Sequence, residues 1–195
     1  SDSGGFSYFW PNDLPFDIEF DKKIYKKIET AIITLSKLDG KVSQMTEQER
    51  NILLVPFVLM ESTKSSAIEG TGTTMEDIYM AERVEETDPR KLMDNLEVLN
   101  YRDALNHATS QKDNAIDEGL LLELHKILMK GVRGENKSPG EYRSVQVLVG
   151  NRGDTLESAK FVPMPPEHVP WKMGNLFDYI SSPDENILLS AALSH

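Results

Sequence analysis

The sequence has 195 residues, 39% hydrophobic and 27% charged, and is expected to fold around one core as a single domain. Its formal net charge of −11 argues against a nucleic-acid partner, because proteins that bind phosphate backbones usually carry a basic surface. It has no cysteine, which excludes disulfides and thiol catalysis, and no apolar run approaches the roughly 20 residues that cross a bilayer. A cytoplasmic protein without a membrane contact is therefore expected.

Two helices are predicted near the N-terminus. The stretch DIEFDKKIYKKIETAIITLSKLDGK places isoleucines at helical spacing with lysines on the opposite face, and Gly40 is expected to end this amphipathic helix. Thr46 and Glu49 form a capping-box pattern ahead of a second apolar run. Pro56 falls inside that run, so the helix that reaches Ile68 is expected to begin near the proline.

Three further helices are predicted in the middle of the chain, each preceded by a polar cap. A short helix follows Thr74, whose spacing to Asp77 repeats the capping pattern. A long helix follows the Asp88–Pro89 pair, an N-cap and first-turn combination, and continues to about Ser110. The third follows Asp117 and contains LLLELHKILMK.

From Ser138 the pattern changes from helical to extended. Val145, Val147 and Val149 alternate strictly, and a GNRGD turn separates them from a second apolar group, FVP. These features predict a β-hairpin, which the prolines that follow keep from extending. Because an isolated hairpin is marginally stable, one hairpin in an otherwise helical chain indicates a functional element.

Two helices are predicted after the hairpin. The first lies around residues 169–180 and contains Gly174 in its interior. The second begins in PDENILLSAALSH and has no stop signal before His195, so the chain is expected to be cut inside a helix of a longer protein.

The sequence contains no complete catalytic apparatus. The four histidines lie in separate predicted elements without the pairing of a metal site. The glycines of EGTGTT neither follow a strand nor precede a lysine-serine pair, and GxSxG does not occur. No catalytic residue and no metal ligand is therefore assigned in this chain.

Three stretches, in this order, resemble proteins of the Fic-domain family, from about residue 60 to the C-terminus. SSAIEG is similar to the family's inhibitory motif, with Ser65, Glu69 and Gly70 in the motif positions. PGEYRSVQVLVGN, a spacer and FVPMPPEHVPWKMGNLFDYI resemble the flap hairpin and the helix after it. ILLSAALSH resembles the start of the helix that leads into the catalytic loop HPFxDGNGR. That loop is missing, and His195 is not its histidine.

The resemblance implies a mostly α fold, a Fic-like helical bundle with one β-hairpin flap. Residues 1–110 would form an N-terminal helical region with the inhibitory helix, and residues 111–195 the first part of the Fic core. Full-length relatives mostly transfer AMP from ATP, with Mg²⁺, to a hydroxyl side chain of a target protein. Without the catalytic loop, this chain alone is expected to be inactive and to bind neither ATP nor Mg²⁺ tightly.

The resemblance also implies roles for two sets of residues. Glu69 would act as a brake, pairing bidentately with an active-site arginine that would otherwise hold the γ-phosphate of ATP. Ser65, one turn earlier, would orient that carboxylate, and Gly70 would let the chain turn. The flap would hold the target as an added strand. Its expected docking residues are Val145, Gln146, Val147, Leu148, Val149, Phe161 and Val162.

Several alternatives stay open at the level of sequence. The chain could be a non-enzymatic helical module that binds a partner protein through the Glu69 helix and the flap. Glu69 could instead position a water for removal of AMP. The sequence does not indicate the target protein, the preferred nucleotide, whether a homo-oligomer forms, or whether a C-terminal DNA-binding domain follows.

Overall fold

The computed structural model describes residues 2–3, 6–16, 19–81, 88–182 and 186–195. Contacts group the chain into two compact units, which we call the helical unit and the flap unit. The helical unit consists of residues 19–114 and 123–139, and the flap unit of residues 1–18, 115–122 and 140–195. The N-terminal residues therefore group with the flap and not with the helices that follow them in sequence.

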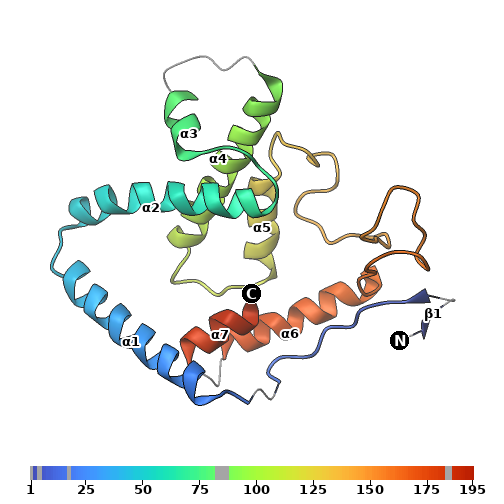
Figure 1. The fold of residues 1–195 in the computed structure, drawn as a ribbon, viewed down its shortest axis with the longest axis horizontal. Helices are drawn as coiled ribbons and strands as arrows, with labels where there is room; N and C mark the ends of the chain where they lie inside the picture. The colour runs from blue at the N-terminus through green and yellow to red at the C-terminus, as the bar shows by residue number, and fades with distance from the viewer. Residues whose placement is uncertain (1, 4–5, 17–18, 82–87, 183–185) are drawn as a thin grey trace. The chain divides into compact units, whose positions relative to one another are not determined.

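Helices make up most of the helical unit (Figure 1). They are α1 (Lys22–Val42), α2 (Glu47–Ile68), α3 (Met75–Ala81), α4 (Pro89–Ser110) and the second part of α5 (Glu118–Leu128). α2 crosses α4, and α3 lies beside both. Leu59, Ile78 and Val98 come from these three helices and form the buried core, with Val98 fully buried.

The second helix differs from the sequence-based expectation. α2 begins at the capping box of Thr46 and Glu49, which confirms the cap, but it passes through Pro56 without ending. The prediction of a helix beginning near the proline was therefore wrong. A proline removes one hydrogen bond, here to the carbonyl of Ile52, and the other bonds of a helix of 22 residues keep it continuous.

α1 forms as an amphipathic helix, with Asp21 accepting hydrogen bonds from the N–H groups of Lys23 and Ile24. Gly40 does not end it, contrary to expectation, because the helix continues to Val42 and the Ser43 N–H bonds back to the Asp39 carbonyl. None of its residues is buried. The apolar face that the spacing predicts exists, but the described residues leave it largely exposed.

The other predicted caps are confirmed. Asp88 accepts from the N–H of Arg90 at the start of α4, with Pro89 as the first helical residue. Thr74 and Asp77 form reciprocal bonds ahead of α3. Asp117 accepts from the N–H of Leu120 in α5.

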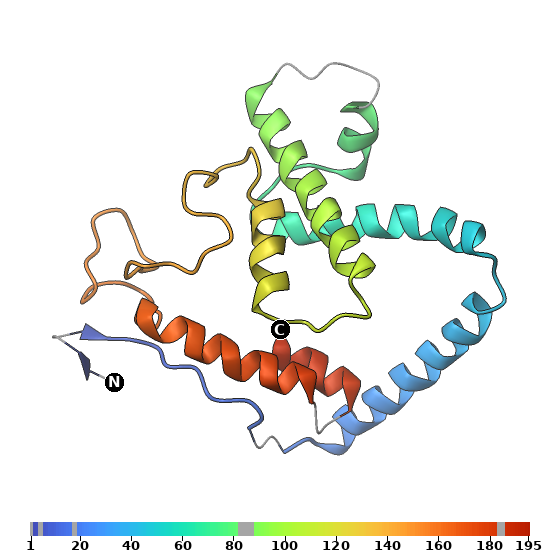
Figure 2. The ribbon, with the colours of Figure 1, turned by 180° about the vertical axis from the view of Figure 1, so that it is seen from behind.

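In the flap unit, two helices lie side by side (Figure 2). They are α6 (Val169–Ser181), preceded by the 3₁₀ turn Pro166–His168, and α7 (Ile187–Ser194). The N-terminal residues form a short antiparallel pair, β1 (Asp2–Ser3) and β2 (Phe6–Ser7), and the chain then follows α6. With helices as the main structure of both units, the prediction of a mostly α fold is confirmed. Among the described residues, no helix is long and apolar enough to span a membrane.

Candidate functional site

Glu69 lies at the C-cap of α2, the last position before the chain turns away from the helix. The N–H of Thr71 bonds to the carbonyl of Ser66 at 3.1 Å, and the N–H of Gly70 to that of Ala67 at 3.1 Å. These two bonds are the pattern of a Schellman motif, which satisfies carbonyls that the end of a helix leaves unpaired. The position of the Glu69 backbone is therefore set by the helix end itself.

Gly70 takes a φ of +94°, in the left-handed region that side chains disfavour. No atom comes within 4 Å of the place where a Cβ would stand. The glycine is therefore required by the backbone conformation and not by a close neighbour.

The hydroxyl of Ser65 bonds to Glu61 and not to Glu69, in contrast to the expectation that it orients the Glu69 carboxylate. Its hydroxyl donates to Oε1 of Glu61 at 2.9 Å, one turn towards the start of the helix. Helical side chains lean towards the N-terminus, which brings Ser65 to the earlier glutamate. Glu69 itself is exposed, and its carboxylate has no hydrogen bond or ion pair with any described residue.

The turn that follows Glu69 is fastened to α4 by two buried threonines. The hydroxyl of Thr71 donates to Oε2 of Glu97 at 2.7 Å, and that of Thr73 donates to Oδ1 of Asn95 at 3.0 Å. Both threonines and Asn95 are less than 10% exposed. Sequence analysis missed these contacts, because the partners lie more than 20 positions apart and no local pattern pairs them.

Arg133 extends this network from the segment after α5. Its Nε and Nη2 donate to the two carboxylate oxygens of Glu97 at 2.9 and 3.0 Å, and Nη2 also donates to Asp94 at 3.0 Å. The hydrogen bonds to Glu97 raise the pKa of Arg133. Glu97 thus joins the turn after Glu69 to a second turn of the chain.

The predicted hairpin is present as a loop, residues 140–163, which we call the flap loop, with far less strand than expected. Val149 and Phe161 form one antiparallel bridge, with N···O distances of 2.8 and 3.0 Å, and residues 145–148 are not strand. Side chains replace the missing ladder, since Gln146 Nε2 donates to the Pro163 carbonyl at 2.8 Å. The prolines after residue 162 cannot donate to a ladder, which limits the pairing.

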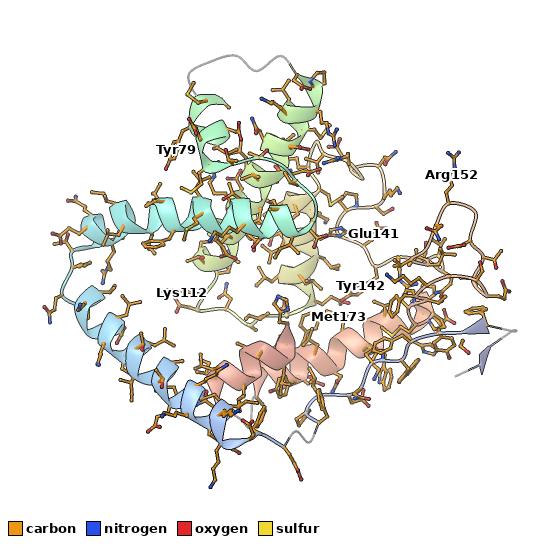
Figure 3. The ribbon with its side chains drawn as sticks, in the orientation of Figure 1. Tyr79, Lys112, Glu141, Tyr142, Arg152 and Met173 are labelled. Atoms are coloured by element: carbon orange, nitrogen blue, oxygen red, sulfur yellow. The ribbon has the colours of Figure 1, made fainter. Side chains whose placement is uncertain are left out.

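The first arm of the flap loop presents its valines outward. Val145, Val147 and Val149 are 64%, 41% and 58% exposed, whereas Gln146 and Leu148 are half-buried. On the second arm Phe161 is exposed and Val162 is buried. Arg152 stands at the outer end of the loop with its side chain pointing away from the ribbon (Figure 3). The valine alternation that predicted a strand is therefore seen as an alternation of exposed and half-buried side chains along the first arm.

The N-terminal segment, residues 8–14, binds both the flap loop and α6, which sequence analysis did not foresee. The N–H of Phe9 donates to the Val162 carbonyl at 2.8 Å, and the rings of Phe9 and Phe161 lie 5.6 Å apart. The buried ammonium of Lys172 donates to the Pro11 carbonyl at 2.7 Å and to Asp13 at 2.6 Å. The contacts of Phe9 place the second arm of the flap loop between Phe9 and Val149, and those of Lys172 join the segment to α6.

The structure is mostly helical. It has a capped helix end followed by a turn bonded to α4, and a loop with exposed valines followed by a helix with a proline in its first turn. These features fit the class of protein that the sequence motifs indicated. Two family models match the chain: the N-terminal model of the Fic/DOC family over residues 25–110, and the Fic/DOC model over residues 115–195. The chain belongs to the Fic/DOC family.

A solved structure supports the fold. A Fic family protein from Desulfovibrio desulfuricans G20 matches with a TM-score of 0.60 and 24% sequence identity. The match covers 93% of this chain and 51% of that one, so this chain spans about half the length of the relative. No match was found among curated proteins.

The resemblance implies that ATP and Mg²⁺ are held by the catalytic loop HPFxDGNGR, a motif that does not occur in residues 1–195. Among the described residues, no three acidic or histidine side chains lie close enough together to hold a metal ion. The residues that the resemblance singles out in this chain, at the end of α2 and in the flap loop, are candidates for regulation and target docking.

Proposed function

We propose that the protein to which this chain belongs transfers AMP from ATP to a hydroxyl side chain of a target protein, and that Glu69 restrains this reaction. Membership of the Fic/DOC family supports the class of reaction. The observation that carries the restraint is the placement of Glu69: an exposed carboxylate at a helix end that Gly70 and Thr71 fix. A positioned carboxylate without a partner in the described chain can accept a bidentate pair from an arginine.

The flap loop supports docking of the target in the same proposal. Its first arm exposes Val145, Val147 and Val149 in alternation, and its second arm is already bonded to Phe9. An extended segment of the target would therefore add beside the first arm, where main-chain bonds give affinity and the valines contact its side chains. Such a strand would hold the target hydroxyl in line for attack.

The test is Glu69→Gly in the full-length protein. We expect transfer of label from α-labelled ATP to protein to rise at least about tenfold, which corresponds to roughly 1.4 kcal/mol of barrier. Glu69→Gln, which keeps the size but removes the charge, should rise nearly as much, because the pair with arginine depends on the carboxylate. The control is Glu76→Gln, an exposed glutamate of α3.

The outcomes of this experiment distinguish the alternative functions that the sequence left open. Equal transfer by Glu69→Gly and the parent, with both active, would refute the brake. If the parent removes AMP from labelled protein and Glu69→Gly does not, Glu69 serves AMP removal. If no variant handles ATP but the chain binds a partner protein in a pull-down, the non-enzymatic module is correct.

A further inference from the structure

We infer that Thr71, Glu97 and Arg133 are positioning residues for the brake, because they tie the end of α2 to α4 and to the turn after α5. The inference rests on the proposed function and adds the means by which Glu69 is held. None of the three touches the Glu69 carboxylate. They act through the backbone that carries it.

Thr71 is the residue through which the helix end is fixed twice. Its N–H closes the Schellman motif on Ser66, and its hydroxyl, 2.7 Å from Glu97, faces α4. Thr71 is buried, at 6% exposure, so a lost bond is not readily replaced by water. A single residue, Gly70, separates this anchor from Glu69 along the chain, which leaves the backbone between them little freedom.

Glu97 accepts from both sides of the network. Its Oε2 takes the Thr71 hydroxyl and one N–H of Arg133, while its Oε1 takes another N–H of Arg133. The Glu97 side chain is 21% exposed and that of Asp94 is 15% exposed, so both carboxylates are partly withdrawn from solvent. A two-pronged guanidinium pair fixes an angle as well as a distance, and it sets where Glu97 meets Thr71.

The turn that carries Arg133 is itself held on α4. The side-chain amide of Asn100 donates to the carbonyls of Leu128 and Lys130, at 3.0 and 2.7 Å. Gly131, with a φ of +69°, donates its N–H to Glu135 at 2.9 Å. The end of α5 and the end of α2 are thus joined through α4, and a shift of the Arg133 turn reaches the residue that anchors Glu69.

The expected increase in transfer depends on how much displacement the pair between Glu69 and an arginine tolerates. A bidentate pair between a carboxylate and an arginine tolerates little displacement, so loosening the helix end lowers the share of molecules in which Glu69 is in place. Loss of one hydrogen bond that holds it should relieve the brake about 2- to 10-fold, less than removal of Glu69 itself.

The experiment compares variants of the full-length protein by transfer of label from α-labelled ATP. Thr71→Val removes the hydroxyl at nearly constant shape and should raise transfer about 2- to 10-fold, whereas Thr71→Ser, which keeps the hydroxyl, should stay near the parent. Arg133→Ala should also raise transfer; because the Arg133 side chain is 60% exposed, its removal leaves no buried cavity. In both raised variants, amide hydrogen exchange of residues 69–73 should be faster.

Double variants distinguish positioning of Glu69 from a role of Thr71 and Arg133 in stability alone. Combined with Glu69→Gly, the Thr71→Val and Arg133→Ala changes should add nothing to transfer, because no brake remains to be positioned. Additive increases, or parent-level transfer in both single variants while Glu69→Gly is raised, would overturn the inference and leave the proposed function standing. Parent-level transfer in Glu69→Gly would overturn both.

Discussion

The conformation of Gly70 determines how α2 ends. After Glu69 the chain must reverse so that Thr71 can bond to both Ser66 and Glu97, and this reversal uses a φ of +94°. Any residue with a Cβ pays a steric cost in that region of φ, even where the space around it is empty. The same residue therefore contributes to stability and to the placement of the Glu69 carboxylate.

We expect Gly70→Ala to lower the free energy of unfolding of the chain by about 1–2 kcal/mol, because alanine is strained at positive φ. Gly72→Ala is a matched control two positions away, where φ is not in that region and the space is also open. It should change stability little or raise it by about 0.5 kcal/mol through the unfolded state. Urea unfolding followed by circular dichroism measures both, and equal losses in the two variants would contradict the argument.

The N-terminal segment, residues 8–14, is bonded along α6, although about 160 residues separate the two in sequence. The backbone of Leu14 exchanges two hydrogen bonds, both 2.8 Å, with the side-chain amide of Asn175. The ammonium of Lys172 lies 5.2 and 5.0 Å from the ring centroids of Trp10 and Trp171. Cation–π contacts and a bonded buried ammonium together fasten residues 8–14 along the helix.

Intrinsic fluorescence should report this attachment, because the two tryptophans of the chain are Trp10 and Trp171, both within it. We expect Asp13→Ala to loosen the segment, which the bonds of Pro11 and Leu14 still hold, to shift the emission to longer wavelength, and to cost about 1 kcal/mol, a value reduced because Asp13 is more than half exposed. Glu19→Ala, an exposed acid outside the segment, is the control. Unchanged emission in Asp13→Ala would show that the Asp13 bond does not hold the segment.

Sequence patterns predicted the helix ends whose capping partners are close in sequence. They did not predict contacts between residues that lie far apart in the chain. The caps at Thr46, Thr74 and Asp88 depend on residues within three positions of one another, so their patterns are visible in sequence. The bond from Ser65 to Glu61 was missed because two glutamates lie at equal spacing from it. The link between Glu97 and Arg133 spans 36 positions and follows from packing alone. The valine alternation predicted a hairpin, but strand pairing occurs only at Val149, because no neighbouring strand completes a sheet among the described residues.

The whole molecule combines strong negative charge with carboxylates that stabilise it locally. At pH 7 the formal net charge is −11, so long-range repulsion opposes folding. Against this, the N–H and hydroxyl of Thr46 lower the pKa of Glu49, and the hydroxyl and N–H of Thr74 lower the pKa of Asp77. A carboxylate whose pKa is lowered by folding stabilises the folded state at neutral pH, and this contribution is lost as pH falls through the lowered pKa.

These two effects predict a maximum in the melting temperature on the acid side of neutrality. As pH falls from 8 the net negative charge shrinks and repulsion weakens, so the melting temperature should first rise. Below the ordinary pKa of a glutamate, about 4.3, the unfolded state takes up protons before the folded state does, because folding lowers the pKa of the capping carboxylates, and the melting temperature should then fall. About 0.5 M NaCl should flatten the rise, because salt screens long-range repulsion, but leave most of the fall, which reflects hydrogen bonds at contact distance.

In Thr46→Ala the cap of Glu49 is absent, so the melting temperature at neutral pH should be lower and the fall in acid smaller. A fall of equal size in Thr46→Ala and the parent would mean that the capping box does not contribute to acid sensitivity, and that other carboxylates cause it.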